Sequence, residues 1–245
     1  MSISGLCKLV GFGIDTAITA AGVGVVALFD ENFAYLLCRA WAHLNLVLFR
    51  IQVRTTRRGP IDPGATYVFM SNHQSQLDIL AVMAALPEFQ LRWVAKRELT
   101  RIPVFGWALQ KCGHIIVDRG NHDEAIARLQ AASARTREGI SVIIFPEGTR
   151  TRSPDVLLPF KKGGFMLALD AGVPIVPVAV RGSFRLLPPH TRDVHGGDID
   201  VIVGAQIPTV GTTREELERR VRAFMCAELG VSSVDIEGLL AARAS

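Results

Sequence analysis

Apolar residues are arranged in two different ways along this chain, and the difference divides it into a short N-terminal part and a larger remainder. The first apolar run, Leu9 to Phe29, contains one aspartate and two threonines among otherwise apolar residues, and a second run extends from Phe33 to Val53. Residues 30–32 separate the two runs and are all polar. Two long apolar segments joined by a short polar turn predict a helical hairpin.

The length of these runs raises the question of membrane contact. The first is close to the roughly 20 apolar residues that a spanning helix needs, whereas Arg39 makes a full crossing by the second costly. We therefore expect the hairpin to dip into one membrane leaflet or to lie along it, with Arg54, Arg57 and Arg58 available to meet lipid phosphates. The alternative is a pair of core helices in a globular domain. A cleaved signal peptide is disfavoured because Asp15 interrupts the first run.

Beyond the hairpin, short apolar runs alternate with longer helical patterns. Proline and glycine are frequent in residues 57–64, so we place the boundary there, with a membrane-associating hairpin at 1–58 and a globular domain at 59–245. Six runs are predicted to be strands: Tyr67–Met70, Leu91–Ala95, His114–Val117, Ser141–Phe145, Ile175–Val180 and Ile199–Val203. The alternation indicates an α/β fold with a mixed, mostly parallel central sheet flanked by helices. Pro174 and Pro177 predict an edge position or a bulge for the fifth strand, because proline lacks a ladder donor.

Composition and missing motifs narrow the function classes. With 49% hydrophobic residues and a formal net charge of +4, the chain favours an acidic surface or an anionic substrate as its partner. The four cysteines form no Cys-x-x-Cys pair and show no metal-ligand spacing, so neither a disulfide framework nor a zinc site is indicated. The glycine-rich signatures of nucleotide-binding enzymes and the Gly-x-Ser-x-Gly elbow of serine hydrolases are absent from the sequence.

The most informative polar stretch is Ser71–Asp78, directly after the first predicted strand. It contains His73 and Asp78 with four residues between them. On one continuous helix these side chains would point about 140° apart, but they can meet if the histidine lies in the loop and the aspartate in the first turn of the next helix. A carboxylate that orients an imidazole is the arrangement of a general base. The alternative is a helix cap, since Ser75–Asp78 also fits a capping box.

Basic residues follow other predicted strands. Arg119 comes after the third strand, Arg150 closes the turn that begins at Pro146, and residues 160–164 read Phe-Lys-Lys-Gly-Gly. Arginine beside exposed backbone amides suits a phosphate, although each such turn alone can be an ordinary polar loop. If the strands are parallel, His73, Arg119 and Arg150 meet at the edge where ligands bind in open α/β sheets. With no acyl-enzyme nucleophile in evidence, the simplest scheme is direct transfer to a substrate hydroxyl activated by the histidine.

Four segments, in this order, resemble the sequence blocks of the glycerolipid acyltransferases. They are Asn72–Asp78, Ile116–Arg119, Phe145–Arg150 and Val173–Val178. The resemblance covers roughly residues 66–180 and is strongest to the bacterial 1-acyl-sn-glycerol-3-phosphate (lysophosphatidic acid) acyltransferases of phospholipid synthesis. It implies transfer of a fatty acyl chain from a thioester to the free hydroxyl of lysophosphatidic acid, which forms phosphatidic acid. One departure is that Gln74 and Gln76 flank Ser75, so the acceptor preference could differ.

The resemblance also implies residue roles and partners. His73 would be the general base and Asp78 its orienting partner. The residues implied to hold the glycerol phosphate are Arg119, Glu147, Gly148, Thr149 and Arg150, with Lys96 and Lys161 as further matches. The implied donor is acyl-coenzyme A or acyl carrier protein, and we expect no cofactor, no metal and no nucleic acid. The hairpin would place the enzyme among membrane lipids on the cytoplasmic face of the inner (plasma) membrane.

Three other functions stay open at this point. The acceptor could be another lysophospholipid or a lyso-aminolipid. A membrane lipid-binding module without turnover would use the same basic face. A thioesterase would replace the acceptor alcohol by water. The sequence does not specify the acyl chain length, the donor carrier, the oligomeric state or the depth of membrane insertion.

Overall fold

The structure, a computed structural model, describes residues 3–118 and 122–231. Within these residues the strands form one seven-stranded sheet in the order β1-β7-β6-β2-β5-β3-β4. The strands are β1 (Ile51–Arg57), β2 (Val68–Ser71), β3 (Leu91–Lys96), β4 (Ile115–Val117), β5 (Ser141–Ile144), β6 (Ile175–Arg181) and β7 (Gly197–Val203). From β6 to β4 all neighbours are parallel, whereas β7 is antiparallel to β6 and pairs in parallel with β1. The prediction of a mixed, mostly parallel sheet is confirmed.

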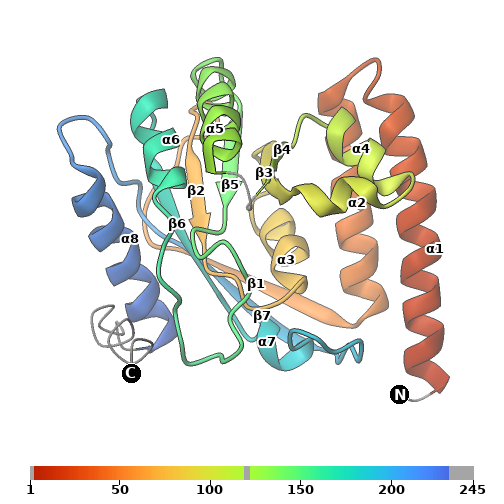
Figure 1. Ribbon diagram of the computed structural model, residues 1–245. Helices are drawn as coiled ribbons and strands as arrows, with labels where there is room; N and C mark the ends of the chain where they lie inside the picture. The colour runs from red at the N-terminus through yellow and green to blue at the C-terminus, as the bar shows by residue number, and fades with distance from the viewer. Residues whose placement is uncertain (1–2, 119–121, 232–245) are drawn as a thin grey trace.

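Helices cover both faces of the sheet (Figure 1). One face carries α2 (Glu31–Leu48) and α3 (Leu77–Ala85), and the other carries α5 (His122–Arg137), α6 (Gly163–Ala171) and α8 (Arg214–Leu229). The shorter helices are η1 (Arg97–Arg101), α4 (Phe105–Lys111) and α7 (Ser183–Leu186). Side chains of β2 and β5 alternate between the two resulting cores, so these central strands are buried on both sides and read as continuous apolar runs.

The strand β1 was not anticipated, and it corrects the predicted domain boundary. Its residues were assigned to the hairpin because the second apolar run continues without a break from the helix into the strand. The break is in the backbone: α2 ends at Leu48, and Arg50 adopts a left-handed φ of 57° that no helix can continue. Residues 51–57 then pair with β7 along their whole length, so they belong to the sheet rather than to a hairpin of residues 1–58.

The predicted edge position of the fifth strand is wrong, because β6 lies inside the sheet between β7 and β2. Pro177 is tolerated there because it faces β7 and not β2. It lies one residue before the Val178–Val203 pair, which is the last pair of the antiparallel β6–β7 ladder at this end. Its carbonyl still accepts a hydrogen bond from the Gly204 amide at 2.8 Å. The missing proline donor therefore falls at the end of a ladder, not within one.

The N-terminal hairpin consists of α1 (Ile3–Val26) and α2, as predicted, and Figure 1 shows it with α4 at one side of the molecule. The polar residues of α1 face α2: Asp15 accepts a hydrogen bond from Asn45 at 2.7 Å, and Thr16 accepts one from the Trp41 indole at 3.1 Å. Large apolar residues point outward instead, among them Val10, Ile14, Ile18, Val25, Leu28, Phe29, Phe33, Leu36, Leu44, Val47 and Leu48. No helix in residues 3–118 and 122–231 is long and apolar enough to cross a membrane.

Three arginines that were expected to meet lipid phosphates form ion pairs within the protein. The pairs are Arg54 with Asp198, Arg57 with Glu88 and Arg58 with Glu228. They connect β1 and the following loop to β7, to the loop after α3 and to α8. Each guanidinium therefore has an anionic partner within the protein, and contact with lipid phosphates stays a prediction.

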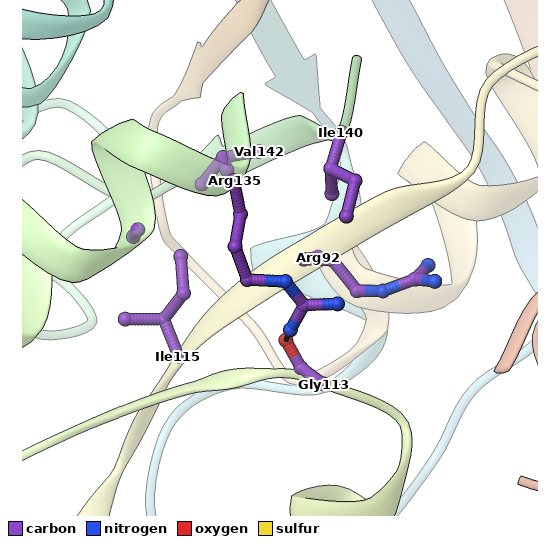
Figure 2. Close-up of a pocket in the computed structure, with 7 residues that line it drawn as sticks. Arg92, Gly113, Ile115, Arg135, Ile140 and Val142 are labelled. Carbon is purple, nitrogen blue, oxygen red and sulfur yellow. Dashed lines mark hydrogen bonds between the residues drawn. The ribbon is translucent and has the colours of Figure 1, made fainter. Parts of the chain in front are cut away.

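A charge cluster attaches α2 to the amino end of β3 and to α5, opposite the edge that carries His73. Arg92 on β3 is 3% exposed and lies 3.7 Å from the Glu31 carboxylate, which also pairs with Arg135 of α5 at 2.8 Å. Figure 2 shows the Arg135 side chain reaching the Gly113 backbone, with Arg92 nearby. Glu31 supplies one negative charge to two guanidinium groups, so the cluster connects the hairpin to the sheet while keeping a net positive charge.

The aromatic contacts around β2 give a test of the core. Phe69 is fully buried and packs against Tyr67 and Phe89 at ring-centroid distances of 5.7 and 5.0 Å. We expect Phe69→Ala to lower the free energy of unfolding by about 3–5 kcal/mol, because it leaves a cavity between the sheet and α3. Phe29→Ala is the control, since Phe29 is 87% exposed. Chemical denaturation measures both, and equal losses would contradict this packing.

Candidate active site

His73 and Asp78 meet as the predicted geometry requires. His73 lies in the loop after β2 and Asp78 in the first turn of α3, and His73 Nδ1 is 2.9 Å from Asp78 Oδ2. The aspartate is completely buried, whereas 15% of the His73 side chain is exposed. The His73 Nε2 atom has no hydrogen-bond partner among the residues that the structure describes. An imidazole held at Nδ1 and open at Nε2 can accept a proton from a bound hydroxyl.

The capping alternative proves compatible with the orienting role. Asp78 Oδ2 also accepts hydrogen bonds from the backbone amides of Gln74 and Ser75 at 2.7 and 2.8 Å. Ser75 Oγ accepts the Leu77 amide and donates to the Leu187 carbonyl. The same carboxylate oxygen therefore satisfies the free amides before α3 and fixes the imidazole, so the loop and the base are held by one group.

The main chain and the ring of His73 are also fixed by the segment that follows β5. The His73 amide donates to Glu147 Oε1 at 2.8 Å, and its carbonyl accepts from the Thr151 amide at 2.9 Å. Its ring stacks on Phe145, with centroids 3.9 Å apart and planes 10° apart. With backbone, ring face and Nδ1 all held, the direction of Nε2 is set before any substrate binds.

Glu147 occupies a different place from the one that the resemblance implies. It is 3% exposed, and its second oxygen, Oε2, accepts the Leu158 amide at 2.9 Å. Burial raises the pKa of the Glu147 carboxyl to about 7, although its two backbone amide donors act to lower it. Both carboxyl oxygens are therefore occupied by backbone amides.

The basic residues after β5 lie together. Gly148 has a left-handed φ of 69°, and a Cβ atom at that position would lie 3.3 Å from Lys161 Cγ, so glycine allows the lysine chain to pass over the turn. The Lys161 amide donates to the Pro146 carbonyl at 2.7 Å. Thr149 is exposed, and Arg150 is half-buried without an ion pair to any described residue. Arg150 directly precedes Thr151, whose amide donates to the His73 carbonyl.

The remaining predicted phosphate ligands belong to the next two strands along the same edge. Lys96 ends β3, opposite Val117 of β4, and its exposed ammonium lies 2.8 Å from Glu98. Arg119 lies outside the described residues. Since β2, β5, β3 and β4 are neighbours and parallel, the loops after them follow one another along the carboxyl edge of the sheet. Within the described residues, no group of three His, Cys, Asp or Glu side chains could hold a metal ion.

Asn72 has a structural role that sequence reasoning did not assign. Its side-chain amide donates to the Val180 carbonyl at 3.0 Å, and its Oδ1 accepts the Val180 amide at 2.7 Å. These two bonds continue the pairing of β2 with β6 past the end of the ladder, so the catalytic loop leaves the sheet at a fixed point. The only signal in the sequence was an amide directly before the histidine.

Comparison with known proteins places this geometry in a family. The model of the Acyltransferase family matches residues 50–181. The chain belongs to this family. It is 36% identical over 193 residues to the 1-acyl-sn-glycerol-3-phosphate acyltransferase alpha of Homo sapiens, covering 77% of this chain and 67% of that protein. It is 29% identical over 210 residues to the chloroplastic 1-acyl-sn-glycerol-3-phosphate acyltransferase BAT2 of Brassica napus, covering 82% of this chain and 60% of that protein.

The fold has a solved counterpart. The crystal structure of the 1-acyl-sn-glycerophosphate (LPA) acyltransferase PlsC from Thermotoga maritima matches with a TM-score of 0.75 at 23% identity, covering 93% of this chain and 95% of that one. The match confirms the α/β fold. An acyltransferase of Schizosaccharomyces pombe is 34% identical over 186 residues, and the chain spans 66% of its length, so the chain covers about two thirds of such relatives.

The raised pKa of Glu147 predicts a pH-dependent contribution to stability. A carboxyl whose folded pKa of about 7 exceeds its usual 4.5 favours folding fully below pH 4.5, and that contribution is lost as the pH rises through 7. We therefore expect the stability of the wild type to fall, relative to Glu147→Gln, between these pH values. Urea unfolding of both proteins at several pH values measures the difference. A relative gain in wild-type stability over this range would contradict the prediction.

Proposed function

We propose that this protein transfers a fatty acyl chain from an acyl thioester to the free hydroxyl of lysophosphatidic acid, which yields phosphatidic acid. The observation that carries the proposal is the His73 imidazole, held by Asp78 at 2.9 Å with Nε2 open. The turn that contacts its main chain bears Arg150, which forms no ion pair with any described residue. The printed names of the relatives support the same acceptor, because those proteins are 1-acyl-sn-glycerol-3-phosphate acyltransferases.

The proposed reaction is a direct transfer in which His73 carries one proton. Nε2 removes the hydroxyl proton as the acceptor oxygen attacks the thioester carbonyl, and a new C–O bond forms. Asp78 stabilises the imidazolium through Nδ1–H, without taking the proton. The C–S bond then breaks, the imidazolium returns its proton to the leaving sulfur, and a free thiol is released. No residue becomes acylated in this scheme, and it requires no cofactor.

The acceptor phosphate is proposed to bind the basic groups along the carboxyl edge of the sheet. Arg150 and Lys161 lie on the two arms of the turn after β5. Arg119 and Lys96 would approach from the neighbouring strands, with Thr149 and the Gly148 backbone completing the site. A guanidinium forks onto phosphate oxygens, and an ammonium adds a compact positive charge, so the set suits a phosphomonoester.

The hairpin is proposed to bring the site to its lipid substrates. The outward apolar side chains of α1 and α2 continue onto η1 and α4 through Leu99, Ile102, Val104 and Trp107. Such a surface suits burial in the outer part of one leaflet, with the α/β domain remaining on the cytoplasmic side. A two-tailed product could then leave directly into the bilayer. Acyl-coenzyme A or acyl carrier protein would deliver the donor from the aqueous side.

The first test removes the proposed base. We expect His73→Ala to lower acyl transfer by about 10²- to 10⁴-fold or more, because the proposed acceptor of the hydroxyl proton is lost. The purified protein is given acyl-coenzyme A and lysophosphatidic acid, and thiol release and phosphatidic acid are both measured. Circular dichroism verifies the fold of the variant. Wild-type rates of thiol release from folded His73→Ala would rule out the assignment.

The second test concerns the acceptor. We expect Arg150→Met to raise the KM for lysophosphatidic acid by about 10- to 100-fold, because a charge-assisted phosphate contact is lost, while the KM for the donor changes little. Arg152→Met is the control, since Arg152 is exposed two residues further along. A panel of lysophospholipids and a lyso-aminolipid separates the alternatives. Equal rates with acceptors that lack a phosphomonoester would favour one of the alternative acceptors. Release of free fatty acid in the absence of any lysolipid would favour a thioesterase.

A further inference from the structure

The carboxylate of Glu147 joins two segments that would otherwise be separate. One oxygen accepts the amide of His73 in the loop after β2, and the other accepts the amide of Leu158, eleven residues further along the chain than Glu147 itself. Both oxygens of Glu147 are thus already used as acceptors for main-chain amides. The buried Glu147 therefore connects main chain to main chain.

The Leu158 end of this connection is held from the opposite side by Arg222 of α8. Arg222 Nη2 donates to the Leu158 carbonyl at 2.8 Å, and Nη1 donates to the Leu157 carbonyl at 3.5 Å. The guanidinium carbon lies 4.5 Å from the centre of the Phe160 ring. The peptide at 157–158 is thus fixed by its amide toward Glu147 and by its carbonyls toward Arg222.

The helix that carries Arg222 is a firm support. Leu217, Val221 and Met225 are completely buried in the core on one face of the sheet. A continuous set of contacts therefore runs from α8 through the 157–158 peptide and Glu147 to the backbone of His73. The chemistry depends on the position of His73 Nε2, and that position depends on where the His73 backbone lies.

We propose that Glu147 and Arg222 are positioning residues for acyl transfer, which hold the main chain of His73 in its reactive place without touching the substrate. This inference rests on the proposed function for its effect on turnover. It assigns Glu147 a different role from the phosphate contact that the family resemblance implies. It also gives a task to Arg222, which no sequence motif contains.

The side-chain chemistry indicates how each variant should act. In Glu147→Gln the amide has one acceptor oxygen and one NH₂ group, so one of the two backbone amides faces a donor. In Arg222→Met an unbranched side chain is kept, while both carbonyl bonds and the contact of the guanidinium with Phe160 are lost. Matched controls are Glu138→Gln at the end of α5 and Arg220→Met on α8, since both residues are exposed and neither pairs with a described residue.

The experiment measures kcat and KM for lysophosphatidic acid in mixed micelles, with rates expressed per folded protein. We expect kcat to fall about 10- to 100-fold in Glu147→Gln and to a smaller extent in Arg222→Met, because a displaced base loses its alignment. The KM for lysophosphatidic acid should stay within about twofold, and the controls should match the wild type. A raised KM with unchanged kcat, or unchanged values for both variants, would overturn the proposal.

A second measurement does not depend on activity. Hydrogen exchange at the His73 amide should be faster in Glu147→Gln and Arg222→Met than in the wild type and the controls, because the amide loses its fixed acceptor. Unchanged exchange in Arg222→Met would overturn the inference even if Glu147→Gln does not fold. Should the wild type form no phosphatidic acid, the proposed function fails, and the exchange result still decides whether these two residues fix the loop.

Discussion

The contact between His73 Nδ1 and Asp78 Oδ2 is the constraint around which the rest of the site is arranged. The two residues lie in different elements, a loop and a helix, so the contact exists only if the chain turns sharply between them. Asp78 makes that turn stable by accepting two backbone amides with the same oxygen. All of these contacts go to Oδ2, whereas the buried Oδ1 has no hydrogen-bond partner among the described residues. The imidazole that Oδ2 orients faces outward at the carboxyl edge of the sheet.

The fold supplies the supports for this contact from several directions. Asn72 fixes the start of the loop to β6, Phe145 covers one face of the ring, and Glu147 holds the main chain. None of these residues is adjacent to Asp78 in sequence, and the parallel order of β6, β2 and β5 brings them together. The same order brings the segment after β5 next to the loop that carries His73. The proposed membrane surface lies on separate elements, so lipid contact and chemistry are divided between the hairpin and the sheet.

Much of this arrangement could be predicted because it depends on local pattern. Strands buried on both faces give apolar runs that are easily recognised, and all six predicted strands are present. The spacing of His73 and Asp78 was sufficient to predict their contact, because the turn between them is short. What could not be predicted depends on partners distant in sequence. β1 is an apolar continuation of α2 until the backbone at Arg50 breaks the helix, and Pro177 looks like an edge residue until the end of the β7 ladder is known. The resemblance named Glu147 as part of the phosphate site, whereas its burial and its two backbone partners are visible only in the folded chain.

The central claim concerns the protonation of one ring, and nitrogen NMR of the imidazole side chains tests it directly. With the His73 signals assigned by comparison with His73→Gln, the account predicts at neutral pH a proton on Nδ1 that is protected from exchange and an unprotonated Nε2. In Asp78→Asn the same proton should exchange faster. A His73 ring that carries its proton on Nε2, or that averages freely between the two nitrogens in the wild type, would contradict the account.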